Sequence, residues 1–345
     1  MASFNIFRRG GSAMSGILNV LGMAVAFAAF YIILVQVNYD LNFNKGIKDS
    51  ERVFIMSSGS LDGADQRQIN FCRPLAEVIL QSSPNIEYGG VLNFTGAGSI
   101  SLWKDNDGTR QDFSIALTSA SGTALKVAGF EAVAGSLDEV TLSNTLAVSE
   151  TIAGKFSLEV GMQVFAEDSP CSIVAIYKDL PDNSHFKHIE AVHNIMDSGI
   201  DNYSEWSYQY LVKVYDPSQI DQMEKSFEGT VRDYYKERYF GQMPSAEEMG
   251  MQQEEMDAVV EKMLNMARCE LISLEDLYYA DEISTPIEKG NKTTTIILLL
   301  VAILVVGIAF INYINFFFAQ IPERIRAVNT KKVLGCTRRK LITDT

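Results

Sequence analysis

The feature that most constrains this chain is an uncharged apolar run near its C-terminal end. Residues 296–319 are 24 consecutive positions without one charged side chain. About 20 such residues, wound as a helix, cross the hydrocarbon core of a bilayer. Because a backbone in hydrocarbon must satisfy its own hydrogen bonds, a helix is the structure that suits an isolated run of this kind. The sequence therefore predicts a transmembrane helix over residues 294–319.

Two amides interrupt this run. Asn312 and Asn315 are spaced i and i+3, which places them on one face of a helix. Lipid cannot satisfy amides, so the spacing favours interhelical polar contacts through that face. The alternative is that both side chains reach the nearby membrane interface, since they lie close to the end of the span.

A basic segment follows at once. Residues 320–345 contain seven basic and two acidic side chains, and positive residues beside a span indicate the cytoplasmic side. The segment could simply bind anionic lipid. Its basic residues alternate with apolar ones and with Gly335, a pattern that favours a short amphipathic helix docked on a protein surface. The basic residues are Arg324, Arg326, Lys331, Lys332, Arg338, Arg339 and Lys340.

A second apolar run, residues 17–37, follows Arg8 and Arg9 as a secretory signal would. It is longer than the apolar region of a typical signal peptide and is not followed by a small-residue cleavage site. We therefore interpret it as an uncleaved transmembrane anchor, with cleavage as the lesser alternative. The expected organisation is cytoplasmic segment 1–16, transmembrane helix 17–37, periplasmic core domain 38–292, transmembrane helix 294–319 and cytoplasmic coupling segment 320–345.

Charge and cysteine content agree with this topology. The chain carries a net charge of −14 although both ends are basic, so the segment between the spans is strongly acidic. An acidic domain argues against nucleic acid as a partner, and its charge also favours solubility. Cys72, Cys171 and Cys269 would be extracytoplasmic; they form no disulfide framework, although one pair could form in an oxidising periplasm.

Within residues 38–292 the hydrophobic pattern predicts two strand–helix–strand units, over 52–94 and 208–274. The second unit includes a helix that starts at the capping box of Ser245 and Glu248 and extends to about Ala267. Between the units lies strand-rich sequence with a hairpin turn at 105–108. We therefore expect an α+β membrane protein: two transmembrane helices flanking an extracytoplasmic mixed α/β domain with a strand-rich insertion.

Metal sites and catalysis are not indicated. His185, His188 and His193, with Glu190, could ligate zinc, but their spacing fits neither a helical face nor a zinc finger, so a structural role is favoured. The methionines at 249–266 are more typical of core packing than of a soft-metal site. The sequence contains no P-loop, no G-x-S-x-G and no H-E-x-x-H motif. We expect no cofactor, no catalytic residue and no enzymatic activity, so any energy used would come from another chain.

Several stretches resemble ABC-transporter permeases of the FtsX-like/MacB type, including their MacB-like periplasmic core domain. The most specific match is residues 310–315 followed by 331–342. Two departures stand out. The family's acidic residue before the Val-Leu-Gly motif is missing from 327–332, and the family's third and fourth spans would follow Thr345, so we expect a fragment, a truncated form or a half that needs a complement. The other matching stretches are 5–9, 130–137, 146–156 and 173–185.

The resemblance implies a permease subunit of the bacterial inner membrane with both termini cytoplasmic. It implies a dimer with a second permease copy, a cytoplasmic ATP-binding subunit that docks on the basic segment, and a periplasmic adaptor or lipoprotein as a further partner. ATP hydrolysis would then move the periplasmic domain for export or mechanotransmission; the cargo stays open. The expected docking residues are Lys331, Lys332, Val333, Leu334, Gly335, Arg338 and Arg339, with Leu334 as the apolar contact.

Two other classes of protein compete with this interpretation. A two-span extracytoplasmic sensor would need an output module after the second span, for which the remaining residues are too few and lack heptads. A membrane-anchored periplasmic enzyme would need a nucleophile and a base, and no such signature occurs. A neighbouring reading frame encoding a P-loop ATPase would favour the permease, and one encoding a kinase would favour the sensor.

Overall fold

The computed structural model describes residues 4–59, 66–106, 108–166, 169–240 and 243–336. The chain divides into two compact units. The terminal unit combines Met1–Leu41 with Asn291–Thr345, and the central unit is Asn42–Gly290.

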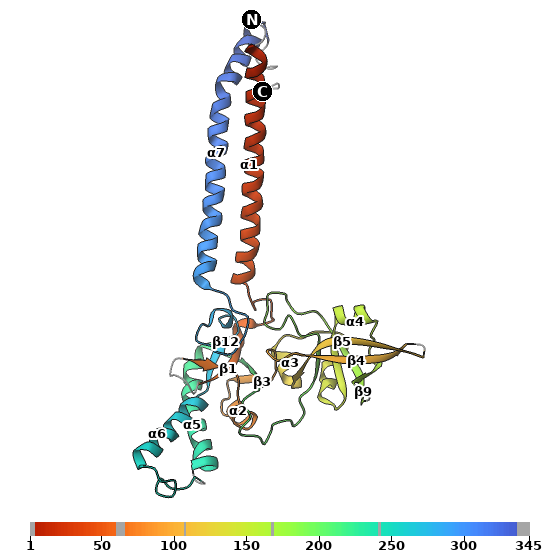
Figure 1. Cartoon of the computed structure of the whole chain (residues 1–345), viewed down its shortest axis with the longest axis vertical. Helices are drawn as coiled ribbons and strands as arrows, with labels where there is room; N and C mark the ends of the chain where they lie inside the picture. Colours follow the sequence, from red (N-terminus) through yellow and green to blue (C-terminus); the bar gives the residue numbers. More distant parts are fainter. Residues whose placement is uncertain (1–3, 60–65, 107, 167–168, 241–242, 337–345) are drawn as a thin grey trace. The chain divides into compact units, whose positions relative to one another are not determined.

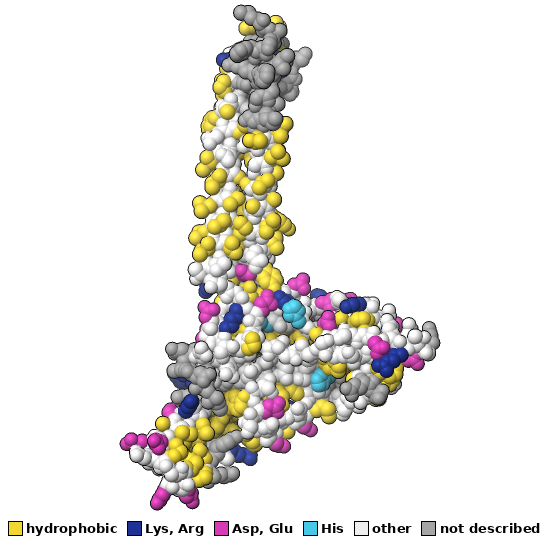
Figure 2. Space-filling view, viewed as in Figure 1, with side chains coloured by type: hydrophobic (Ala, Val, Ile, Leu, Met, Phe, Trp, Pro, Cys, Tyr) yellow, Lys and Arg dark blue, Asp and Glu magenta, His cyan; other side chains and the backbone are white. Residues whose placement is uncertain are grey.

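The terminal unit is a pair of long helices. Helix α1 is Phe4–Leu41 and helix α7 is Lys292–Val333, and the two lie side by side (Figure 1). Both are long and apolar enough to cross a membrane, by length and composition. Large apolar side chains such as Ile32 and Leu304 are exposed along them, and Figure 2 shows hydrophobic side chains covering this pair. Water would not tolerate so large an apolar surface, whereas lipid would cover it.

Small residues let the two helices approach. On α7, Ala302 is fully buried and Ala309 nearly so, and on α1 Gly22 and Ala26 line the groove that faces α7. Small side chains at such a contact allow close backbone packing, which is the usual basis of helix association in lipid. The spacing of these residues therefore explains why the helices pair along this face.

Polar contacts join the helix pair near its connections to the central unit. The Thr295 hydroxyl donates to Asp40 Oδ2 at 2.8 Å, and Gln36 donates to Asp40 Oδ1 at the same distance. Asn291 caps α7 by accepting a hydrogen bond from the Thr294 N–H. Asp40 and Thr295 are both buried, so the first turn of α7 is fixed to the last turn of α1.

The basic segment continues α7 to Val333 and is not the separate short helix that the sequence favoured. Gly335 ends it in the left-handed region (φ 82°). The Gly335 N–H donates to Lys332 O at 3.1 Å and the Cys336 N–H to Lys331 O at 3.0 Å, which is the Schellman pattern of helix ends.

The central unit contains two sheets. The first has the order β12-β1-β11-β3, and each strand is antiparallel to its neighbours. Because β1-α2-β3 and β11-α5-β12 interleave in this order, the sheet is a split βαβ arrangement. Its bounds are β1 Val53–Gly59, β2 Arg67–Gln68 (paired with β1), α2 Arg73–Leu80, β3 Ile86–Val91, β11 Tyr210–Val214, α5 Ile220–Tyr235, α6 Gln253–Ala267 and β12 Glu270–Ser273.

Both faces of this sheet are buried, because side chains alternate along each strand. Val53 and Ile55 of β1 belong to the core on one face, and Phe54 and Met56 belong to the core that includes residues of α2 and α5. Helix α2 has apolar side chains at helical spacing because one of its faces is buried in this core.

The second sheet is inserted between β3 and β11. Its order is β6-β9-β7-β10-β5-β4-β8, and β8 also pairs with β9, so six strands close into a small barrel with β6 beside β9. Closure removes the open sheet edges that a planar sheet would expose. The bounds are β4 Gly98–Asn106, β5 Thr109–Ala120, α3 Gly122–Val127, β6 Ala132–Gly135, β7 Thr145–Ser149, α4 Glu150–Phe156, β8 Gln163–Ala166, β9 Ser169–Tyr177 and β10 Ala191–Asn194.

The predicted fold class is confirmed: two strand–helix–strand units carry a strand-rich insertion, and two apolar helices flank the domain. Short helical turns complete the chain. These are the 3-10 helices η1 Ser50–Arg52, η2 Leu137–Thr141, η3 Pro217–Gln219 and η5 Leu277–Tyr279, and the π-helix η4 Lys236–Phe240.

One predicted helix start is wrong. The capping box forms, since the Ser245 N–H donates to Glu248 Oε2 at 2.8 Å and the Glu248 N–H to Ser245 Oγ at 3.3 Å. The turn that it begins ends at Gly250, whose φ is 67°. Helix α6 therefore begins only at Gln253. A left-handed glycine interrupts the helical hydrogen bonds that the capping box alone would have predicted to continue.

Candidate functional site

The segments that continue into α1 and α7 are bound together inside the central unit. Residues 42–47 directly follow α1 in the sequence and residues 274–290 precede α7; both contact the loop 181–187 that follows β9. We call these three segments the junction. The Asn44 backbone N–H donates to Asn183 O at 2.7 Å, and the Asn183 side-chain amide Nδ2 donates to Asn42 O at 2.8 Å.

Asn44 is the centre of the junction. Its side chain is fully buried, and its φ of 64° is one that asparagine tolerates better than most residues. Its amide Nδ2 donates to Leu274 O at 2.6 Å and to His185 Nδ1 at 2.9 Å, while its Oδ1 accepts from the His185 backbone N–H at 3.0 Å. One side chain thus connects the chain after α1 to both other segments.

His185 extends this connection to the segment before α7. Its Nε2 lies 2.9 Å from the carbonyl oxygen of Glu288 and must donate, because a carbonyl only accepts. Nδ1 is then the unprotonated nitrogen that accepts from Asn44. Burial lowers the pKa of His185 to about 4, which keeps the ring in this neutral form at neutral pH.

Close ring packing completes the junction. Phe43 stacks on Tyr278 with ring centroids 3.9 Å apart and meets His185 edge-on at 4.9 Å. A Cβ on Gly290 would lie 2.1 Å from the Tyr278 ring, so only glycine fits there. The Gly290 N–H also donates to Tyr278 O at 2.8 Å.

The central side chains of the junction are joined by hydrogen bonds. Asn44 and His185 are buried and hydrogen-bonded to each other, and His185 is also hydrogen-bonded to the Glu288 carbonyl oxygen. Interiors packed in this way are poorly compressible and transmit displacement.

The neutral state of His185 makes the stability of the junction depend on pH. Above pH 6.5 neither the folded nor the unfolded state holds the proton; between pH 6.5 and about 4 the unfolded state takes it up and the folded state does not. The free energy of unfolding should therefore fall by roughly 3 kcal/mol across this range. Unfolding of the wild-type protein and of His185→Gln, measured from pH 7 to 4.5, should show their difference shrinking as the pH falls.

The control for this measurement is His188→Gln, since His188 is exposed. This variant should follow the wild-type pH dependence. A constant difference between wild type and His185→Gln at every pH would contradict the assignment of the neutral ring to the junction.

The predicted interhelical asparagines occupy different positions. Both side chains are exposed; Asn312 lines the groove between α1 and α7 together with Asn19, whereas Asn315 does not line it. The Asn19 amide nitrogen is buried there without a hydrogen-bond partner among the described residues. Sequence reasoning did not single out Asn19, although it interrupts the first apolar run as Asn312 interrupts the second.

The expected docking residues lie at the end of α7. Lys331, Lys332 and Val333 form its last turn, and Leu334 and Gly335 follow it. Val333 is 87% and Leu334 80% exposed, an unusual degree of exposure for apolar side chains. Arg338 and Arg339 lie outside the described residues.

The histidines and cysteines lie in separate surroundings. His185 is in the junction and His193 in β10, and no group of three His, Cys, Asp or Glu side chains in the described part of the chain could hold a metal ion. All four cysteines are free thiols. Burial raises the pKa of Cys72 to about 11 and also raises that of Cys269.

Comparison with known proteins gives a family match. Residues 17–230 match the protein family described as the MacB-like periplasmic core domain. No curated protein matches the sequence.

Several solved structures are similar to parts of the chain. They include a permease domain from Porphyromonas gingivalis (17% identity, 57% of this chain and 88% of that chain, TM-score 0.47). The periplasmic region of MacB from Actinobacillus actinomycetemcomitans has 13% identity over 68% of this chain and 92% of that chain, with a TM-score of 0.41. The extracellular domain of the ABC-type transporter YknZ from Gram-positive bacteria has 13% identity over 53% and 94%, with a TM-score of 0.37.

Proposed function

Because this chain belongs to the family with a MacB-like periplasmic core domain, a component of ABC-type permeases and not a classical enzyme, we propose that it couples ATP hydrolysis by a separate cytoplasmic subunit to movement of its periplasmic domain. Members of this family are embedded in the membrane and work with a cytoplasmic ATPase. In this proposal 1–16 and 320–345 are cytoplasmic, 17–37 and 294–319 span the bacterial inner membrane, and 38–292 is periplasmic.

The junction is the observation that most supports coupling. A domain that only had to be tethered could be joined to its spans by flexible linkers, which tolerate any sequence. Here the chain on both sides is fixed by buried hydrogen bonds from Asn44 and His185, and a rotation or shift of a span would be passed on. In this proposal the periplasmic domain moves without any substrate passing between α1 and α7. The junction is therefore compatible with both efflux and mechanotransmission.

The end of α7 supports the docking of an ATPase subunit. Two exposed apolar side chains, Val333 and Leu334, adjoin Lys331 and Lys332, which gives an apolar contact beside positive charge. Interfaces of this kind take their affinity from the apolar centre and their specificity from the surrounding charges. Helix α7 continues from the span through Pro322 to the docking residues, so a displacement at its end would reach the bilayer segment along the same helix.

Purification of the full-length protein from its native membranes tests this function. We expect a P-loop ATPase subunit to co-purify, together with a second permease copy, and the ATPase to be retained in detergent of low ionic strength, since salt screens the charge contacts. Co-purification of a histidine kinase without an ATPase would contradict the proposal and favour a two-span sensor.

A further inference from the structure

Helix α4 covers one end of the barrel of the central unit. At that end Ile152 and Phe156 of α4 pack onto the same apolar core as Phe113. The ammonium group of Lys104 covers them by donating to the carbonyl oxygens of Phe156, at 2.5 Å, and Ser157, at 3.2 Å.

The other end holds a cavity of about 170 Å³. Each of the six barrel strands contributes at least one residue to its wall, which identifies it as the mouth of the barrel and a favourable position for a ligand. The wall includes Ile100, Leu117, Leu146, Ala166, Cys171 and His193, one from each strand. Cavities of about 150 Å³ that are lined by apolar side chains hold a benzene-sized molecule, so this one has room for a single leucine or phenylalanine side chain.

A polar groove of about 680 Å³ adjoins the cavity and shares Ile100, Leu117 and His193 with it. Amide and hydroxyl side chains such as Asn93 and Gln209 line the groove together with Trp206. Neither lining includes Asp, Glu, Lys or Arg among the described residues, although the chain as a whole is strongly charged. The ligand that fits is uncharged, which excludes phosphate headgroups and carboxylates.

His193 adds a hydrogen-bond acceptor at the boundary between cavity and groove. Its Nδ1 donates to the Asn194 carbonyl oxygen at 3.0 Å, and burial lowers its pKa, so the neutral ring keeps a lone pair on Nε2. The hydrogen bonds of the described residues leave that nitrogen without a donor. A backbone N–H next to an inserted side chain would supply one.

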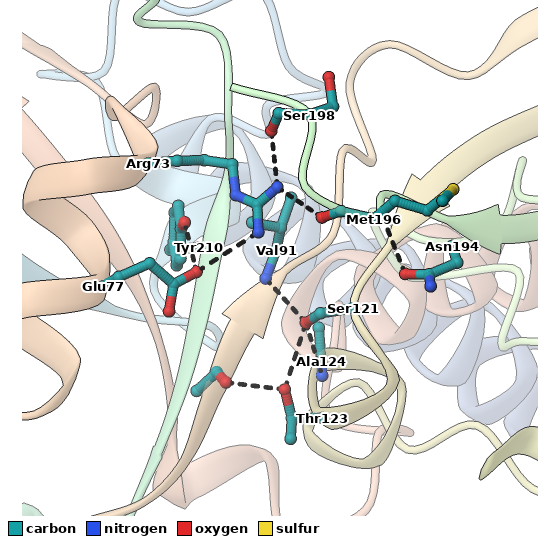
Figure 3. A network of polar contacts seen from close by, with 11 residues as sticks. Arg73, Glu77, Val91, Ser121, Thr123, Ala124, Asn194, Met196, Ser198 and Tyr210 are labelled. Atoms are coloured by element: carbon teal, nitrogen blue, oxygen red, sulfur yellow. Dashed lines mark hydrogen bonds and ion pairs between the residues drawn. The ribbon is translucent and has the colours of Figure 1, made fainter. Parts of the chain in front are cut away.

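The rim of the mouth is held in a fixed conformation from the first sheet (Figure 3). Arg73 of α2 is buried and donates to the carbonyl oxygens of Met196 at 2.8 Å and Ser198 at 2.6 Å. Met196 lines the cavity, is 52% exposed and has a φ of 51°, which is costly for a residue other than glycine. The Asn194 side chain accepts the Met196 N–H at 3.0 Å. Strain held in place by a buried arginine is typical of a prepared binding site.

We propose that the mouth of the barrel and the adjoining groove bind an uncharged, extended polypeptide segment of a partner protein. One leucine- or phenylalanine-sized side chain enters the cavity, and the backbone on either side hydrogen-bonds to His193 and to the amides of the groove. A lipid acyl chain fits less well, because the apolar cavity is short and the groove beyond it is polar. Peptide binding at this site does not depend on ATP coupling. A negative result for one proposal therefore leaves the other standing.

Protection of the Cys171 thiol tests the site, since Cys171 lines the cavity and is partly exposed. The full-length protein in lipid nanodiscs, without ATPase, is alkylated with iodoacetamide in the presence of the capped peptide acetyl-Ser-Gly-Leu-Gly-Ser-amide, and modification is followed by mass spectrometry. Matched peptides carry phenylalanine or alanine in place of leucine. We expect the leucine and phenylalanine peptides to slow alkylation of Cys171 at least about tenfold, and the alanine peptide to have little effect.

Controls are built into the chain. Cys336 lies outside the site, and its alkylation should not change with any peptide. Ala166→Leu fills the cavity and should abolish protection, whereas Ala132→Leu adds the same atoms at an exposed position of β6 and should leave protection unchanged. Unprotected Cys171 with every peptide, or equal protection by the alanine peptide, would overturn the proposal. Protection by toluene as strong as by the leucine peptide would assign the cavity to small apolar ligands and would also overturn it.

Discussion

Replacing Asn44 with alanine is expected to lower the free energy of unfolding by about 4 kcal/mol, a large effect for one substitution. The substitution leaves Leu274 O, the His185 N–H and His185 Nδ1 without their partner, all inside the junction. About 1 kcal/mol of this loss comes from the backbone, because alanine tolerates a φ of 64° less well than asparagine does. Urea unfolding of the full-length protein in micelles, followed by circular dichroism, measures the loss.

Asn144→Ala is the matched control. Asn144 has a similar φ of 56° but is exposed, so its replacement should cost only about 1 kcal/mol through the backbone. Asn44→Gly removes the hydrogen bonds and tolerates the φ, and should lie between the two alanine variants. If Asn44→Ala destabilised the protein no more than Asn144→Ala, the hydrogen bonds of the junction would not be the source of its rigidity.

Reversing Arg338 and Arg339 to glutamate is expected to abolish the stimulation of ATP hydrolysis by the permease. The substitutions replace two positive charges that closely follow Leu334 in the sequence by negative ones, and like-charge contacts with the proposed ATPase surface would cost several kcal/mol in an interface. The measurement is the ATPase rate of the co-purified subunit, reconstituted with wild-type or variant protein in nanodiscs. Leu334→Ala should lower the stimulation by a smaller amount, about tenfold or less.

The control carries the same change of charge elsewhere. Lys225→Glu with Lys262→Glu reverses two exposed positive charges in the central unit, on α5 and α6 and outside the junction, and should leave stimulation intact. Unchanged stimulation by the Arg338 and Arg339 variant would remove this segment from the ATPase interface. Equal loss with both double variants would point to net charge and not to docking.

Local elements of this fold could be predicted from local signals. The apolar spacing of α2 and the hairpin turn between β4 and β5 both depend on neighbours a few residues away. The basic segment was harder to interpret, because an amphipathic pattern does not reveal whether a helix is separate or continues a span. The predicted start of α6 was wrong for a related reason. The capping box at Ser245 favours a helix, whereas the left-handed Gly250 ends the turn that the capping box begins.

Contacts between distant residues could not be predicted. Asn44 is 141 residues from His185, which is 103 residues from Glu288, and a lone asparagine after an apolar helix predicts only a turn. The closure of the barrel depends on β8 pairing with both β4 and β9, and β8 is only four residues long. The mouth of the barrel, with His193 in its wall, follows from that closure and has no motif of its own.

The most direct test of coupling across the membrane uses two of the protein's own cysteines, which the proposed topology places on opposite sides. Cys171 is partly exposed in the central unit, and Cys336 follows the end of α7. Spheroplasts expressing the full-length protein are treated with a membrane-impermeant maleimide before and after permeabilisation. We expect Cys171 to be modified in intact spheroplasts and Cys336 only after permeabilisation. Modification of Cys336 in intact spheroplasts, with Cys171 protected until lysis, would place the domain in the cytoplasm and contradict the coupling of an inside ATPase to an outside domain.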